Sequence, residues 1–123
     1  MTLRKSINEA AGLSDEQHCY LTTVGRVSGR KHTIEIWFAL SGSSLFMLSG
    51  NRDRSDWVRN AMKHPRVTIR IRDRVFEADA RIIEDAEEDA LARRLLRDKY
   101  ADPGITWFPD WIVTALPVAF DLM

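Results

Sequence analysis

Five or six short strand-like runs, separated by turns and by two helical stretches, constrain the fold of this 123-residue chain most strongly. The runs are expected at about 18–25, 32–40, 45–49, 67–72, 75–83 and 118–122. A short helix is expected from a cap at Ser55 or Asp56 to about Lys63, and a longer one from an Asp85–Glu88 capping box to about Tyr100. Because strands and helices do not alternate regularly, the pattern favours a small antiparallel β-barrel or α+β domain over a doubly wound parallel sheet.

Apolar residues recur at every second position in three of these runs, as in a half-buried strand. Residues expected to share one face are Ile34, Ile36, Phe38 and Leu40 in the second run, Val67, Ile69 and Ile71 in the fourth, and Phe76, Ala78, Ala80 and Ile82 in the fifth. The run 45–49 is predicted to be a fully apolar strand.

Length and composition predict one domain that spans residues 1–123 and has no linker. The content of 45% hydrophobic and 29% charged residues is that of an ordinary soluble protein. The sequence offers no transmembrane segment, and its first dozen residues, where a short helix is expected, lack the apolar region of a signal peptide. Cys19 is the single cysteine, which indicates a reducing cytoplasm and a small buried side chain rather than a nucleophile.

The segment 21–31, Leu-Thr-Thr-Val-Gly-Arg-Val-Ser-Gly-Arg-Lys, places a tight turn between two strand-like runs. Glycines let backbone N–H groups approach an anion, and guanidinium groups fit phosphate. The segment is therefore either a phosphate-binding turn or a solvated hairpin turn with surface arginines. The residues that would bind phosphate are Gly25, Arg26, Ser28, Gly29, Arg30 and Lys31.

The charges are unevenly distributed although the net charge is zero. Residues 24–74 hold eleven Lys and Arg against four Asp and Glu, and the remainder holds seven against fourteen. A region of positive potential favours an anionic ligand. The same imbalance would arise if surface strands simply carried arginines and helices carried glutamates.

A second polar loop, 49–54, follows the third strand and leads into the short helix. A basic, glycine-containing loop before a helix N-terminus favours anion binding, because free N–H groups and the helix dipole both attract negative charge. Trp57 and Asn60 lie three residues apart and share a helix face. They are either a core aromatic with a polar neighbour, or the wall and the fixed hydrogen bond of a cofactor groove.

Four motifs, in this order, resemble the deazaflavin-dependent nitroreductase family: Leu21–Arg30, Ile34–Leu40, Ser55–Asn60 and His64–Ile69. The resemblance runs from about Tyr20 to Tyr100. It implies a mainly β (α+β) fold, namely a split β-barrel of about six antiparallel strands with two or three helices, related to the flavin-linked pyridoxamine-phosphate oxidases. It further implies a cytoplasmic oxidoreductase that transfers hydride from reduced coenzyme F-420, a 5-deazaflavin, to a small flat acceptor such as a quinone, a nitroaromatic or an activated double bond.

The resemblance also implies which residues hold the coenzyme. Its phosphate and acidic tail would be bound by Arg26, Ser28, Gly29, Arg30 and Lys31, with weaker tail contacts from Arg52 and Arg54. Its ring and sugar-like chain would lie along Ser49, Gly50 and Asn51, in a groove supported by Trp57 and Asn60. The catalytic proton donor is not identified, and the candidates are Ser49, Tyr100 and solvent.

Trp107, Phe108 and Trp111 occupy the C-terminal segment in which family members often carry tyrosines over the substrate side. They are expected to form an apolar lid over a flat substrate, a part of the core, or a dimer contact. A homodimer with Trp37 or Trp107 at its interface would fit the split-barrel resemblance.

Other interpretations use the same residues. FMN also has a phosphate and a flat ring, so these loops would equally serve an FMN-dependent reductase, or a module that binds a flavin or deazaflavin without turnover. Nucleic-acid binding is disfavoured, because the strand faces that carry Arg70, Arg72 and Arg74 lack interleaved aromatic residues. No metal site is expected, because the three histidines lie far apart without ligand-like spacing.

Overall fold

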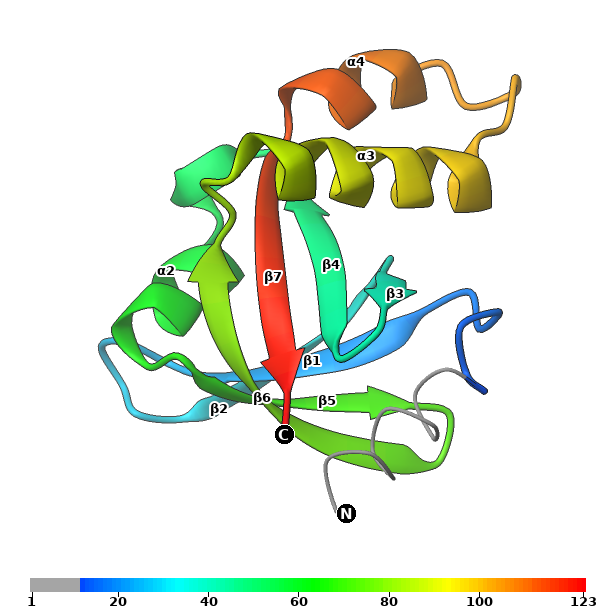
Figure 1. Ribbon diagram of the computed structural model, residues 1–123. Helices are drawn as coiled ribbons and strands as arrows, with labels where there is room; N and C mark the ends of the chain where they lie inside the picture. Colours follow the sequence, from blue (N-terminus) through cyan, green and yellow to red (C-terminus); the bar gives the residue numbers. More distant parts are fainter. Residues whose placement is uncertain (1–11) are drawn as a thin grey trace.

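Seven antiparallel strands form one curved sheet in the computed structural model, which describes residues 12–123 (Figure 1). The strands are β1 (Cys19–Val24), β2 (Lys31–Ile36), β3 (Ala39–Ser41), β4 (Ser44–Ser49), β5 (Arg66–Ile71), β6 (Arg74–Ile82) and β7 (Leu116–Leu122). They are hydrogen-bonded in the order β2-β1-β5-β6-β7-β4-β3. The mainly β, split-barrel fold expected from the sequence is confirmed. The helix expected in the first dozen residues falls almost wholly outside the described residues.

The single strand expected at 32–40 is wrong, because the structure divides it into β2 and β3 at opposite ends of the strand order. β2 pairs with β1, whereas β3 pairs with β4, and only Trp37 and Phe38 separate the two strands. Phe38 leaves the ladder because its N–H donates to the Tyr100 hydroxyl at 3.0 Å, and that hydroxyl lies 3.0 Å from its carbonyl oxygen. The chain therefore passes directly from one edge strand of the sheet, β2, to the other edge strand, β3. The sheet has seven strands, whereas about six were expected.

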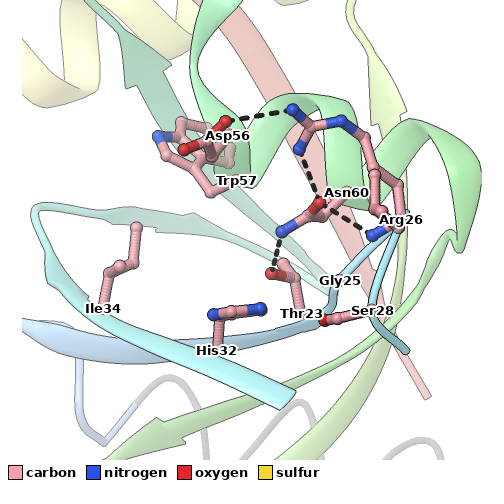
Figure 2. Close-up of a pocket in the computed structure, with 10 residues that line it drawn as sticks. Thr23, Gly25, Arg26, Ser28, His32, Ile34, Asp56, Trp57 and Asn60 are labelled. Carbon is pink, nitrogen blue, oxygen red and sulfur yellow. Dashed lines mark hydrogen bonds and ion pairs between the residues drawn. The ribbon is translucent and has the colours of Figure 1, made fainter. Parts of the chain in front are cut away.

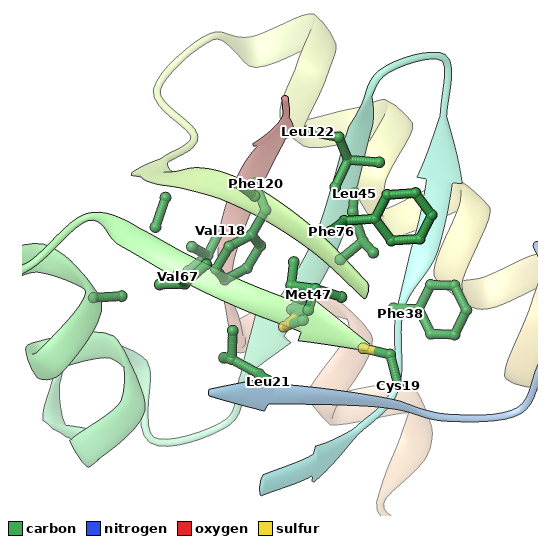
Figure 3. Packing of buried hydrophobic residues seen from close by; sticks show 14 of the residues in the cluster. Cys19, Leu21, Phe38, Leu45, Met47, Val67, Phe76, Val118, Phe120 and Leu122 are labelled. Carbon is green, nitrogen blue, oxygen red and sulfur yellow. The ribbon is translucent and has the colours of Figure 1, made fainter. Parts of the chain in front are cut away.

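Two clusters of buried hydrophobic side chains occupy the two faces of the sheet. The larger cluster lies inside its curve and includes Leu21, Phe38, Met47, Ile69 and Phe120 (Figure 3). The smaller cluster lies under the C-terminal helices and includes Phe46, Leu48, Leu96, Ile112 and Ala119. Successive residues of β4 alternate between the two clusters, which explains why that strand is apolar throughout.

The alternation predicted in β5 and β6 is confirmed. Their buried residues are Val67, Ile69 and Ile71 in β5, and Phe76, Ala78 and Ala80 in β6, while Ile82 is half-buried. The residues between them carry mostly charged side chains toward solvent. The period of two therefore fixed which face of each strand enters the core.

The helices of the described residues are the short 3-10 turn η1 (Arg52–Arg54), α2 (Asp56–Lys63), α3 (Ala86–Tyr100) and α4 (Phe108–Thr114). Figure 1 shows α3 lying across the ends of β4 and β7, with α4 beside it. The sequence did not predict α4, which begins with Pro109 in its first turn. No helix among residues 12–123 is long and apolar enough to cross a membrane.

The predicted helix caps are formed only in part. The Asp85 carboxylate accepts a hydrogen bond from the Glu88 N–H at 2.9 Å, as the capping box predicts. The Glu88 carboxylate does not complete the box, because it binds the Arg81 guanidinium at 2.7 and 2.8 Å. Ser55 precedes α2 but makes no capping bond, since its hydroxyl bonds that of Ser49 at 2.6 Å.

Candidate functional site

A cavity of about 410 Å³ lies between the turn that joins β1 to β2 and the first turns of α2 (Figure 2). We call it the turn cavity. Its lining residues are Thr23, Gly25, Arg26, Val27, Ser28, His32, Ile34, Asp56, Trp57 and Asn60. Four of the residues predicted to hold the coenzyme therefore come together here: Arg26, Ser28, Trp57 and Asn60.

Asn60 attaches this turn to α2. Its side-chain oxygen accepts hydrogen bonds from the Arg26 backbone N–H at 3.1 Å and from the Arg26 guanidinium at 2.9 Å. Its amide nitrogen donates to the Thr23 hydroxyl at 3.3 Å. Since only 4% of Asn60 is exposed, these bonds are made away from water and fix the position of the turn. Asn60 thus makes the fixed hydrogen bonds that the sequence suggested, but makes them to the protein itself.

Arg26 also pairs with the first residue of α2. One of its guanidinium nitrogens lies 3.1 Å from the Asp56 carboxylate. The sequence placed Arg26 among three cations and gave no sign of this partner, which lies thirty residues away. The sequence analysis therefore missed the part that Asp56 plays at this site.

The turn itself depends on the small size of Gly25. Its N–H donates to the Arg30 carbonyl at 2.7 Å, which closes the turn. A Cβ atom at this position would lie 2.8 Å from the Ser28 hydroxyl, 2.9 Å from the His32 ring and 3.1 Å from the Arg30 carbonyl. A side chain at this position would therefore displace Ser28 and His32, which both line the cavity.

Gly29, Arg30 and Lys31 lie beside the cavity rather than in its lining. Gly29 adopts φ of 73°, a left-handed conformation that favours glycine. The Ser28 hydroxyl accepts a hydrogen bond from the Arg30 N–H at 3.1 Å. Arg30 and Lys31 are exposed, so two of the three predicted cations face solvent at the mouth of the turn.

Trp57 and Ile34 form the apolar wall of the turn cavity. Both are half-buried and pack against the larger core cluster. The Trp57 ring centroid lies 6.3 Å from that of Phe120, inside the sheet. The two interpretations of Trp57 are thus compatible, because one face of this side chain belongs to the core and another lines the cavity.

The second predicted loop, residues 49–54, is hydrogen-bonded to the end of α4. The Ser49 hydroxyl donates to the Arg52 carbonyl at 2.7 Å, and Ser49 itself is buried. The Arg52 guanidinium donates to the Thr114 carbonyl, and Arg52 adopts φ of 55°. A Cβ atom on Gly50 would lie 3.3 Å from the Trp111 ring. Ser49, Gly50, Asn51 and Arg54 are thus absent from the lining of the turn cavity, and Gly50 lies beside the aromatic segment.

A second cavity, of about 440 Å³, is largely aromatic, and we call it the tryptophan cavity. Its lining residues are His18, Glu35, Ile36, Trp37, Leu48, Trp107 and Trp111. The rings of Trp37 and Trp107 are each nearly perpendicular to that of Trp111, with centroids 5.7 Å apart in both pairs. On its polar side the Nδ1 atom of His18 lies 3.2 Å from the Glu35 carboxylate. A flat apolar molecule matches such a lining.

The two cavities lie along the same strand. Ile34 lines the turn cavity and Ile36 lines the tryptophan cavity. Residues two apart on a strand face the same side, and the rise along a strand separates them by about 7 Å. An elongated molecule lying along β2 would therefore contact both cavities.

Tyr100 and Lys99 support the wall of the tryptophan cavity from behind. The Tyr100 ring stacks on Trp37 with centroids 4.3 Å apart, and its hydroxyl donates to the Gln17 carbonyl at 2.8 Å. Lys99 donates to the Phe38 carbonyl at 3.0 Å. Burial raises the pKa of Tyr100 to about 12 and lowers the pKa of Lys99 to about 8.

Cys19 is fully buried, and burial raises the pKa of its thiol to about 12. The expectation of a small buried side chain is therefore confirmed.

Among residues 12–123, no group of three His, Cys, Asp or Glu side chains could hold a metal ion. His32 also lines the turn cavity. It precedes Ile34 by two residues in the predicted strand, and this spacing, which puts both on one face, was the one sequence signal for its position in the site.

Comparisons with known proteins agree with this fold. The family model described as F420H(2)-dependent quinone reductase matches residues 3–120. No curated protein matches the chain. A solved structure described as an F420-H2 dependent reductase has 21% sequence identity and a TM-score of 0.67, covering 87% of this chain and 94% of that one.

Two other solved structures have the same fold at lower sequence identity. The heme storage protein of Vibrio cholerae has 17% identity and a TM-score of 0.73, covering 94% of this chain and 89% of that one. A structure described as a domain-swapped dimer has 19% identity and a TM-score of 0.69, covering 99% of this chain and 97% of that one. The likeness to all three structures establishes the fold.

Proposed function

Because the chain belongs to the family of F420H(2)-dependent quinone reductases, we propose that it acts as a single domain that transfers a hydride from reduced coenzyme F-420 to a small flat acceptor. Family membership makes its general class that of an oxidoreductase dependent on this coenzyme. The proposal adds the acceptor class, namely a quinone, a nitroaromatic or an activated double bond. It also adds the residues that hold each partner.

The observation that carries the proposal is the position of the two cavities on one strand. A turn with three cations borders the first cavity, and three tryptophans line the second. Hydride transfer requires the donor and the acceptor to be held in contact, with their reacting atoms in line. A coenzyme bound along β2, with its anionic end at the turn, would bring its ring toward the tryptophans.

The residues of the turn cavity fit the anionic part of the coenzyme. The Ser28 hydroxyl and the His32 ring lie at its edge, and Arg30 and Lys31 are exposed beside it. Guanidinium, ammonium and hydroxyl groups are the donors that bind phosphate and carboxylate. In the proposal these groups bind the phosphate and the acidic tail, Trp57 and Asn60 support the groove, and Arg52 and Arg54 make weaker contacts with the tail.

The ring of the coenzyme is assigned to the end of β4. Gly50 lies against Trp111, which lines the tryptophan cavity, and in the proposal the ring lies along Ser49, Gly50 and Asn51 beside that cavity. Gly50 is exposed, so its backbone is accessible to a flat ring. When bound, the coenzyme supplies the hydride, and the protein binds, orients and excludes water.

The acceptor is assigned to the tryptophan cavity. Trp107 is 54% exposed, whereas Phe108 is buried in the smaller core cluster. Of the three aromatic residues expected as a lid, Trp107 and Trp111 are thus available to a substrate, and Phe108 anchors α4. Aromatic faces bind flat conjugated molecules by stacking.

Ser49, Tyr100 and solvent are the three candidates for the donor of the proton that the acceptor takes up after the hydride. Both hydroxyls already bond to carbonyl groups of the protein, Ser49 to Arg52 and Tyr100 to Gln17. Replacing Tyr100 by Phe tests one candidate. A proton donor requires a large fall in kcat with little change in coenzyme affinity, whereas a supporting role predicts a fall in stability and a raised KM for the acceptor.

The family match supports coenzyme F-420 and gives no support to the FMN alternative. The heme protein of similar fold has only 17% identity, so the likeness to it gives no ground for assigning its ligand to this chain. The proposal includes that the protein is a homodimer. The dimer of similar fold and the exposed side chain of Trp107 support this oligomeric state. Light scattering of the purified protein measures its oligomeric state directly.

The test of the proposed function is a titration followed by turnover. The protein is titrated with coenzyme F-420 and with FMN. Quenching of the fluorescence of Trp57 by the bound ligand reports binding. Oxidation of the reduced coenzyme is then followed with a naphthoquinone, a nitroaromatic and an enone. Tight binding of F-420 with turnover of one acceptor supports the proposal. Preference for FMN would overturn the assignment of the coenzyme, and binding without turnover would leave a binding module.

A further inference from the structure

Asp56 brings a carboxylate into the lining of the turn cavity, where the proposed function requires an anion (Figure 2). Among the lining residues in the described part of the chain, it is the one acidic side chain, and Arg26 is the one Lys or Arg. The two are paired at 3.1 Å. The protein therefore places its own negative charge on the cation that an anionic ligand would use.

Arg26 does not need Asp56 to keep its position. Asn60, which is buried, accepts bonds from both the guanidinium and the backbone N–H of Arg26. Asp56 approaches from the solvent side, where its side chain is 84% exposed and that of Arg26 is 30% exposed. An ion pair exposed to this degree is weak, and a ligand with a higher negative charge can displace it.

We propose that Asp56 is an internal competitor for the anionic group of the ligand, and that it leaves Arg26 when a phosphate or carboxylate binds in the turn cavity. The guanidinium then binds the anion with the donors that had held Asp56, while Asn60 keeps it in place. Asp56 lowers the affinity of the site, because each binding event must first break the ion pair and then bring two negative charges near one another. This inference rests on the proposed function and names the residue that sets its affinity for the coenzyme.

The sign of the effect separates this inference from a supporting role. If Asp56 oriented Arg26 for the ligand, its neutralisation would weaken binding. If Asp56 competes with the ligand, its neutralisation strengthens binding. Asp53 provides a matched control, because it is an exposed aspartate three residues earlier that lies outside the cavity lining.

The experiment compares Asp56→Asn and Asp53→Asn with the unmodified protein by titration with coenzyme F-420, at low and at high salt. We expect Asp56→Asn to bind roughly three- to tenfold more tightly at low salt and Asp53→Asn to stay within about twofold. If the unmodified protein binds F-420, weaker or unchanged binding by Asp56→Asn would overturn the inference. An equal gain in both variants would also overturn it, since the effect would then be one of overall charge.

A second arm separates this inference from the proposed function. The melting temperature of each protein is measured with increasing inorganic pyrophosphate, which probes the anion site without the coenzyme. A larger shift for Asp56→Asn than for the other two proteins supports the inference even if none of them binds F-420, an outcome that would reject the proposed function alone. Asp56→Ser guards against a folding defect, because serine is tolerated in the first turn of a helix. Equal pyrophosphate shifts together with equal F-420 affinities reject the inference and leave the proposed function standing.

Discussion

The side-chain oxygen of Asn60 accepts two hydrogen bonds from Arg26, one from the backbone N–H at 3.1 Å and one from the guanidinium at 2.9 Å. A residue of α2 thereby fixes both the path of the β1–β2 turn and the direction of its first cation. The turn and the helix are far apart in sequence, and this pair of bonds makes them one site. The consequences for stability and for binding are separable by mutation.

Replacing Asn60 by Ala is expected to reduce the free energy of unfolding by about 1–3 kcal/mol, because it leaves buried donors without a partner. The same variant should bind the coenzyme more weakly, since the turn loses its anchor. Urea unfolding and fluorescence titration measure the two effects. Thr23→Val, which removes only the 3.3 Å bond at the other end of Asn60, serves as a comparison and should lose less stability than Asn60→Ala, because it leaves one donor without a partner rather than two. An Asn60→Ala protein of unchanged stability would show that these bonds contribute nothing net.

Arg26 and Arg30 should behave differently when each is replaced by Ala. Arg30→Ala removes an exposed cation, so we expect weaker coenzyme binding with unchanged stability. Arg26→Ala also removes a partner of Asn60 and should lower both affinity and stability. The double variant is expected to lose about 2–5 kcal/mol of binding free energy if both guanidiniums contact the phosphate. Unchanged affinity in a folded double variant would refute the phosphate-binding role of the turn.

Replacing Gly25 by Ala is expected to disturb the turn cavity through contact rather than through backbone conformation. The added methyl group would push the Ser28 hydroxyl and the His32 ring aside and would press on the Arg30 carbonyl. Gly29→Ala is the matched control, because a Cβ there meets nothing within 4 Å and the cost arises from φ of 73° alone. We expect Gly29→Ala to lose about 1–2 kcal/mol of stability with a smaller loss of affinity than Gly25→Ala. Equal affinities in the two variants would contradict this distinction.

Lys99 should make stability rise with pH in the weakly alkaline range. Burial lowers its pKa in the folded protein from 10.5 to about 8, so between these values the unfolded chain binds more protons than the folded one. The penalty for burying its charge is therefore complete below about pH 8 and is relieved as the pH rises toward 10.5. Urea unfolding at pH 7 and pH 9.5 should show that the native protein gains stability relative to Lys99→Met.

The comparison with Lys99→Met removes two opposing contributions. Burial raises the pKa of Cys19 and of Tyr100 to about 12, so ionisation of these groups in the unfolded chain lowers stability as the pH rises through their ordinary values. Both groups are present in the variant, and their effects cancel in the difference. Parallel pH profiles for the two proteins would mean that Lys99 does not titrate in this range.

Local patterns in the sequence predicted a large part of this structure. The period of two in β5 and β6 fixed their buried faces, because successive side chains of a strand point to opposite sides. The glycines of the β1–β2 turn and the N-cap at Asp85 were also readable, since their geometry depends on a few neighbouring residues. The same turn and the Trp57–Asn60 pair were predicted as parts of a site for this reason, and the structure brings them to one cavity.

Contacts between distant residues could not be predicted in this way. The division of 32–40 into β2 and β3 depends on Tyr100 and Lys99, which bind the backbone of Phe38 from more than sixty residues away. The pairing of Asp56 with Arg26 and the gathering of Trp37, Trp107 and Trp111 arise in the same manner.

The sequence by itself thus determined most of the strands, the buried faces of β5 and β6, the basic turn and the family. Only the tertiary structure decided which cation is free to bind an anion and where the aromatic residues meet. The physical reason is that alternation and turn propensity act over a few residues, whereas an ion pair or a cavity depends on which segments the folded sheet brings together.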